Sequence, residues 1–304
     1  MFKRFFDKNL CNLIIDESVK YSKQNNDPKF KLDMKDLHRF VGILFFTGYH
    51  PFSQMNMYWS NKPGTGDHRI KNSMSRNRFL EIKKYFHLCD NDHIDKSDKF
   101  FKVRAFFNIL NMNFQQFEIF SHRLSIDEQM VPYFGRHSCK MFIKSKPTRF
   151  GFKLWCLASS DGYLFNFFPY AGASSLPSEY LLGEKVVLKL LEVVENPKQH
   201  KVYFDNFFSS IRLMKELKEM GFAAAGTIQE NRTSACNILN SKKEMKKKNK
   251  GHMEVSTRED GICLVKWADN DITFASNYIG IHSQQNIRRH KKKALSDQIL
   301  QPRL

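Results

Sequence analysis

The chain has 304 residues, of which 41% are hydrophobic, and its 49 Lys and Arg against 31 Asp and Glu give a formal net charge of +18. This composition excludes wholesale disorder and supplies enough apolar residues for one large domain or two ordinary ones. No apolar stretch approaches the roughly 20 residues that a membrane-spanning helix needs. The positive charge predicts a polyanionic partner, nucleic acid before an anionic membrane surface; the alternative is a merely soluble basic protein.

The six cysteines form no CxxC pair and are scattered through apolar segments. This spacing excludes a disulfide framework and a zinc site made by this chain alone, and it fits a reducing compartment. The N-terminal stretch MFKRFFDKNLCNLII lacks a clean apolar block and a small-residue cleavage site. We therefore expect no signal peptide at this end.

Residues 1–122 are expected to be mostly α-helical. Apolar residues recur at helical spacing between Phe6 and Val19, and Asp33 is placed to cap a second helix. Ser75 is placed to cap a third helix, and a fourth is expected to run from about residue 103 to residue 120.

The pattern changes near Leu124, where short apolar stretches of strand length begin. Asp161-Gly162 is a strong two-residue turn signal between two of these stretches, which predicts a hairpin. Strands are expected over 125–133, 151–160, 163–172, 200–210, 222–228, 261–269 and 272–278, and helices over 181–194 and 211–220. Mixed strands flanked by helices indicate an α/β fold. A hairpin followed by helix-connected strands is the order of a ribonuclease-H-like fold.

Two aspartates lie at or within these apolar stretches: Asp127 in SIDEQMVPY and Asp205 in VYFDNFFSS. A carboxylate is costly there unless a charged group offsets it. A divalent ion such as Mg²⁺ does so, since it takes oxygen ligands from one or two carboxylates plus substrate phosphates. The alternatives are a helix cap for Asp205 and a salt bridge to a nearby Lys or Arg for Asp127.

Two further acids lie close to these positions or to a turn. Glu128 follows Asp127 and is expected to point to the other face of an extended segment, which favours a structural role. Asp269 has the position of a third ligand, but the adjacent Asn270-Asp271 turn signal favours a role in a hairpin.

The basic residues fall into groups. One group lies between candidate strands, interleaved with aromatic residues, and predicts a phosphate-contacting loop: Arg136, His137, Lys140, Lys144, Lys146 and Arg149. The alternative is a solvated basic loop. Two lower-complexity runs, 242–250 and 288–293, are interpreted as disordered tails, nuclear-import signals or non-specific DNA contacts.

At these residues the sequence resembles the piggyBac transposase family, including its domesticated, transposase-derived members. The most specific block is residues 125–172, beginning SIDEQMVPYFGRHSCKMFIKSKPTRFGFKLW. It is preceded by LHRFVGILFFTGYHPFSQMNMYWS (37–60), MSRNRFLEIKKYFHLCDND (74–92) and KVRAFFNILNMNF (102–114), and followed by VYFDNFFSSIRLMKELKEMGFAAAGTI (202–228) and LVKWADNDITFASNY (264–278).

The resemblance implies a ribonuclease-H-like catalytic domain of the DDE type, with an acidic triad and Mg²⁺ or Mn²⁺. It also implies cut-and-paste transposition: nicking at the transposon ends, hairpin formation and insertion at TTAA. Asp127 matches the first catalytic, metal-binding aspartate of the family, and Asp205 matches the second.

The chain departs from the family pattern after Ile299-Leu300-Gln301-Pro302. The third family aspartate follows such a segment in a GGVD motif, and this sequence contains no GGVD. We therefore expect the third-acid helix and the cysteine-rich C-terminal module to be absent from this chain. The expected organisation is a helical dimerisation or DNA-binding-like region (1–122), the first part of the catalytic core (123–228), a basic insertion (229–262), and last core strands with a basic tail (263–304).

Three functions remain open at this point. The first is a transposable element-derived protein that binds DNA but is catalytically incomplete, with weak metal affinity. The second is a fragment of an active transposase, and the third is a non-enzymatic chromatin adaptor that retains the fold. All three predict DNA as partner and a nuclear location. The resemblance adds a possible homodimer, and no membrane or small-molecule substrate is expected.

Overall fold

The computed structural model describes residues 2–116, 120–144, 146–172, 180–233, 240, 242–249, 251–268 and 272–280. The chain divides into two compact units, Met1–Gln116 and Phe117–Leu304. The sequence placed this boundary a few residues later, between 122 and 123. Among the described helices, none combines the length and the apolarity that a membrane span requires.

The first unit is helical, as the sequence predicted. The predicted caps are confirmed: Asp33 accepts a hydrogen bond from Asp36 N (2.7 Å), and Ser75 accepts one from Arg78 N (3.3 Å). Apolar faces of these helices meet in a core that includes Leu10, Ile14 and Phe79. The helices are α1 (Phe2–Phe5), α2 (Lys8–Gln24), α3 (Met34–Tyr49), α4 (His68–Ser73), α5 (Arg76–Tyr85) and α6 (Phe101–Gln115).

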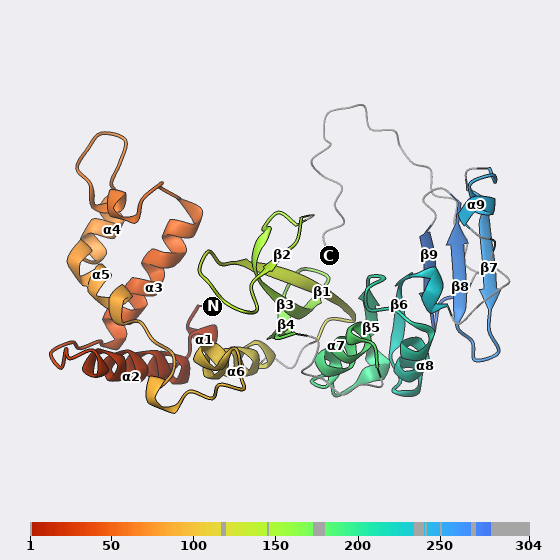
Figure 1. Ribbon diagram of the computed structural model, residues 1–304, viewed down its shortest axis with the longest axis horizontal. Helices are drawn as coiled ribbons and strands as arrows, with labels where there is room; N and C mark the ends of the chain where they lie inside the picture. The colour runs from red at the N-terminus through yellow and green to blue at the C-terminus, as the bar shows by residue number, and fades with distance from the viewer. Residues whose placement is uncertain are drawn as a thin grey trace. The chain divides into compact units, whose positions relative to one another are not determined.

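The second unit is built on one mixed sheet (Figure 1), with nine strands in the described residues. Their order is β2-β3-β1-β5-β6-β9-β8-β7, and β4 pairs with β3 outside this path. The β1–β5 and β5–β6 pairs are parallel, and the other pairs are antiparallel. The strands are β1 (Arg123–Pro132), β2 (Met141–Phe142), β3 (Phe150–Ser159), β4 (Leu164–Pro169), β5 (Lys201–Phe204), β6 (Ala223–Ile228), β7 (Met253–Thr257), β8 (Cys263–Trp267) and β9 (Ile272–Ser276).

The two hairpins predicted in this unit are confirmed. β3 and β4 pair in antiparallel fashion around the Asp161-Gly162 turn, where Gly162 has a φ of 87° that favours glycine. The turn is closed by a hydrogen bond from Ser159 N to Tyr163 O (2.8 Å). β8 and β9 form the second hairpin.

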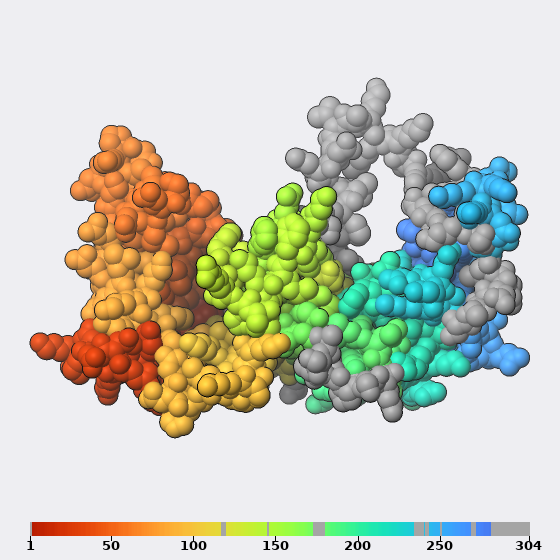
Figure 2. All heavy atoms as spheres, viewed as in Figure 1, coloured from red at the N-terminus to blue at the C-terminus, as the bar shows by residue number. Residues whose placement is uncertain are grey.

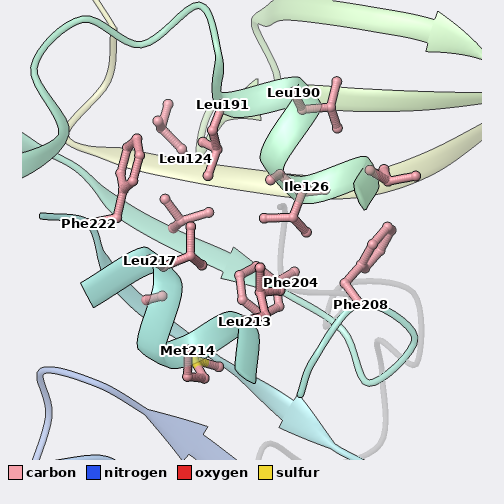
Figure 3. Packing of buried hydrophobic residues seen from close by; sticks show 14 of the residues in the cluster. Leu124, Ile126, Leu190, Leu191, Phe204, Phe208, Leu213, Met214, Leu217 and Phe222 are labelled. Carbon is pink, nitrogen blue, oxygen red and sulfur yellow. The ribbon is translucent and has the colours of Figure 1, made fainter. Parts of the chain in front are cut away.

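The core of this unit lies between the sheet and the helices α7 (Leu182–Leu191) and α8 (Ile211–Glu219). Alternate residues of the parallel strands point into it, among them Leu124 and Ile126 of β1 and Phe204 of β5. Figure 3 shows these side chains gathered against those of α7 and α8. The same alternation directs the neighbouring side chains, including that of Asp127, to the other face of the sheet.

The segment 229–262 differs from the expected basic insertion. It contains a short helix, α9 (Lys242–Met245), and strand β7, which pairs with β8 and extends the sheet. The sequence showed little of this strand, because only one face of MEVST is apolar and an edge strand has a single neighbour.

Candidate functional site

Asp127 and Asp205 lie side by side because β1 and β5 are neighbouring parallel strands. The pairing runs in register from Arg123 opposite Lys201 to Ile126 opposite Phe204, and the two aspartates are the next residue of each segment. Neighbouring strands are about 4.8 Å apart. The sequence predicted strand positions for these two acids, and the pairing places both directly after the paired segments of β1 and β5.

The turn that follows β5 holds Asp205 in place. Its Oδ1 accepts a hydrogen bond from Phe207 N (2.9 Å), and its carbonyl accepts one from Ser209 Oγ (3.0 Å). Arg232 Nη1 donates to the carbonyl of Phe207 (2.6 Å), which fixes the turn from the other side. The N-cap of α8 is Ser210. The alternative in which Asp205 caps this helix is therefore wrong.

The electrostatics of the pair disfavour two negative charges. Burial raises the pKa of Asp127, and the negative charges of Glu128 and Asp205 add to this effect. Burial likewise raises the pKa of Asp205, again with a contribution from Glu128. A bound cation would relieve the repulsion, since a nearby positive charge favours the ionised form of a carboxylate.

The charge of the basic residue Lys146 lowers the pKa of both aspartates. Its Nζ is 3.0 Å from Glu128 Oε1, and within the described part of the chain it forms no ion pair with Asp127 or Asp205. Burial lowers the pKa of Lys146, but the hydrogen bond to Glu128 and the three carboxylate charges outweigh it and raise the pKa. The salt bridge considered for Asp127 is thus formed by its neighbour Glu128.

Cys156 lies opposite Asp127 in the β1–β3 register. Burial, reinforced by the charge of Asp127, raises the pKa of the Cys156 thiol to about 12. The thiol therefore stays protonated at neutral pH. Among the described residues there is no group of three or more His, Cys, Asp or Glu arranged to hold a metal ion. What remains is a two-carboxylate, all-oxygen donor set.

The chain is similar to known proteins over its whole length. A family model described as Transposase IS4 matches residues 1–304. Human PiggyBac transposable element-derived protein 2 is 33% identical over 311 residues, covering 100% of this chain and 52% of that protein. Human PiggyBac transposable element-derived protein 3 is 34% identical over 306 residues, covering 99% of this chain and 51% of that protein.

This chain belongs to the piggyBac family. It spans about half the length of the two curated relatives, 52% and 51%. Its fold matches a solved piggyBac transposase synaptic complex with hairpin DNA, with a TM-score of 0.81 and 21% identity, over 93% of this chain and 61% of that chain. The expected fold class is confirmed: an α/β, ribonuclease-H-like mixed sheet flanked by helices and preceded by a mostly α-helical region.

The six basic residues expected to contact phosphate take different positions in this piggyBac-family chain. They lie in the connection from β1 to β3, which projects as the yellow-green lobe in Figure 2. Arg136, Lys144 and Arg149 are exposed. Lys140 donates to the carbonyl of Gly135 (3.2 Å), and His137 accepts from Cys139 N (3.1 Å), so these two organise the loop itself. Lys146 pairs with Glu128 instead.

Two other predictions fall outside the described residues. Asp269, weighed as a third ligand or a hairpin residue, is one of them, and the basic run 288–293 is the other. The run 242–250 is described except for Lys250, and it begins with the short helix α9.

The sequence interpretation missed Glu184, a buried acid at the start of α7. Its carboxylate accepts hydrogen bonds from Ser210 Oγ, which caps α8, from Arg212, and from Leu181 N (2.7 Å). Glu184 therefore ties the start of α7 to the start of α8. One signal was available, since Glu184 shares a helix face with Val187 and Leu191, which are both buried.

We expect Glu184→Gln to lower the free energy of unfolding by about 1.5 kcal/mol at neutral pH, because hydrogen bonds to a charged acceptor are lost or weakened. Burial alone would raise the pKa of Glu184, but Arg212, Ser210 and the Leu181 amide lower it below 4.5. The stabilisation is then present above about pH 4.5 and lost as the pH falls through the folded pKa.

Urea denaturation at neutral and at acidic pH measures this effect. The deficit of Glu184→Gln is expected to shrink as the pH falls. Glu192→Gln, which removes an exposed charge at the other end of α7, is the control and is expected to match the wild type at both pH values. A deficit that is independent of pH would contradict the charged network.

Proposed function

We propose that this chain is a DNA-binding, transposase-derived protein in which Asp127 and Asp205 form a metal site in a DDE-type nuclease fold. The observation that carries the proposal is the parallel β1–β5 register, which brings the two aspartates together. Support comes from membership of the piggyBac family and from the likeness to a transposase solved with hairpin DNA.

The donor set fits Mg²⁺ or Mn²⁺, which take oxygen ligands and are commonly held by one or two carboxylates plus substrate phosphates. When bound, such an ion stabilises the developing charge on the oxygens of a phosphoryl displacement. Asp127 and Asp205 would hold the ion at the end of the parallel strands. Lys146 neutralises Glu128, so that this third negative charge does not add fully to the repulsion.

We propose weak metal affinity for the pair, because two carboxylates form a sparse site. The activity of a full-length transposase, insertion at TTAA, a homodimer on DNA and a nuclear location are further predictions that rest on the family. A chain that binds DNA without any contribution from metal would instead fit the non-enzymatic adaptor.

Salt-dependent DNA binding tests the proposal. Each phosphate contact contributes about 0.9 to the slope of log affinity against log salt concentration. A double variant, Lys144→Gln with Arg149→Gln, is expected to lower that slope by about two. Both side chains are exposed in the connection from β1 to β3, which also carries Lys146.

The matched control is Lys189→Gln with Lys198→Gln, which removes two exposed positive charges from the α7 region. We expect this control to leave the slope unchanged. Fluorescence anisotropy of a labelled duplex over a salt series provides the measurement. Equal losses in the two double variants would mean that general charge, and not the loop, governs binding; a wild type whose affinity does not depend on salt would overturn DNA binding altogether.

A further inference from the structure

Lys153 of β3 lies in a cage of three aromatic rings, close to Glu128. Its Nζ is 4.0 Å from the ring centre of Trp155, 4.8 Å from that of Tyr170 and 5.4 Å from that of Phe207. Contacts among its members hold the cage together. Phe207 stacks on Trp155 with ring centres 5.4 Å apart and an interplanar angle of 19°, and Tyr170 N donates to the carbonyl of Lys153 (2.9 Å).

The cage and the carboxylates share a structural element. Phe207 forms one wall of the cage, and its amide donates to Asp205 Oδ1 (2.9 Å). Trp155 lies opposite Glu128 in the β1–β3 register. Lys153 is also close enough to Glu128 and Lys146 for their charges to act on its pKa.

The ammonium group of Lys153 has unused hydrogen-bonding capacity. Within the described residues it forms no hydrogen bond and no ion pair, whereas the ammonium of Lys146 is paired with Glu128. Burial lowers the pKa of Lys153, which shows that the charged form is poorly solvated. Cation–π contacts stabilise the charge by up to about 2 kcal/mol, but they leave the N–H donors without acceptors.

An anion with several acceptor oxygens would accept hydrogen bonds from the ammonium group of Lys153. The cage fixes the long side chain, so little conformational entropy remains to be lost on binding. A phosphodiester supplies strong acceptors to an ammonium donor. The proposed metal site at Asp127 and Asp205 would draw the same kind of ligand to this edge of the sheet.

We propose that Lys153 is a DNA-contacting residue, which its cage of Trp155, Tyr170 and Phe207 presents to a backbone phosphate of the DNA that the proposed metal site holds. This assignment rests on the proposed function. It adds a phosphate contact from β3 to those proposed for the basic loop.

Lys153→Met tests the assignment, because Met fills the apolar cage without a charge. We expect the slope of log DNA affinity against log salt concentration to fall by about 0.9 relative to the wild type. Lys189→Met is the matched control: it also removes a lysine that lies over a ring, 4.7 Å from the centre of Phe168, and its slope is expected to stay unchanged. Lys153→Arg is expected to retain the slope of the wild type.

A second measurement needs no variant. Reductive methylation of the wild type, read by mass spectrometry, is expected to modify Lys153 more slowly when duplex DNA is present and Lys189 at the same rate. DNA binding by the wild type with an unchanged slope in Lys153→Met, or with no protection of Lys153, would overturn this assignment alone. A wild type without salt-dependent DNA binding would overturn both the assignment and the proposed function.

Discussion

Asp127→Asn and Asp205→Asn are each expected to weaken Mn²⁺ binding at least about tenfold, or about 1.4 kcal/mol, because each removes one of two charged ligands. Both variants are also expected to be more stable than the wild type at neutral pH without metal. Burial raises both pKa values, so the ionised carboxylates destabilise the folded state, and neutral Asn removes that penalty.

The pH dependence of this gain follows from the direction of the shifts. A folded pKa above the unfolded value of 3.8 means that the relative stabilisation is complete below about pH 3.8 and is lost as the pH rises through the folded pKa. The stability gain of each Asn variant is therefore small in acid and larger at neutral pH.

Isothermal titration with Mn²⁺ and thermal unfolding without metal measure the two effects. Asp161→Asn, in the exposed β3–β4 turn, is the control and is expected to change neither. The combination of lost metal affinity with gained stability separates the loss of a ligand from misfolding. Unchanged Mn²⁺ affinity in both variants would mean that the two aspartates share no metal.

Gly183→Ala is expected to destabilise the sheet unit by about 3 kcal/mol through overpacking. Alanine normally stabilises a helix relative to glycine by about 1 kcal/mol. At Gly183, however, an added Cβ would lie 2.7 Å from the Cα of Phe208 and closer still to the carbonyl oxygen of Phe207. Both neighbours are backbone atoms of the turn after Asp205, so relief requires that this turn move.

Gly42→Ala is the matched control, because Gly42 lies in α3 and an added Cβ there meets nothing within 4 Å. It is expected to stabilise the helical unit by up to about 1 kcal/mol. Hydrogen exchange read by mass spectrometry resolves the two units separately. Protection of α7 and β5 that is unchanged in Gly183→Ala would show that the close approach is not maintained in solution.

The part of the fold set by local signals was predictable from the sequence. The caps at Asp33 and Ser75 and the turn at Asp161-Gly162 each depend on a few neighbouring residues, and all three are confirmed. Strand β7 was missed, because its pairing with β8 is a tertiary contact and its own pattern is weak.

Of the candidate site, the sequence marks only the two aspartates. Each is marked by its own strand context, whereas their adjacency follows from the β1–β5 register. The cage around Lys153 draws on β3, the end of β4 and the turn after β5, and the Glu184 network joins two helices. The spacing of residues along the chain does not predict these contacts, because they form between segments that are distant in sequence.

The parallel pairing of β1 with β5 also has a kinetic consequence. The β3–β4 hairpin joins residues that are close in sequence. β1 and β5, in contrast, are separated along the chain by this hairpin and by α7. Contacts between residues far apart in sequence form slowly, because a long loop must close first. We therefore expect Asp127 and Asp205 to become neighbours late in folding, and the proposed metal affinity to depend on this step.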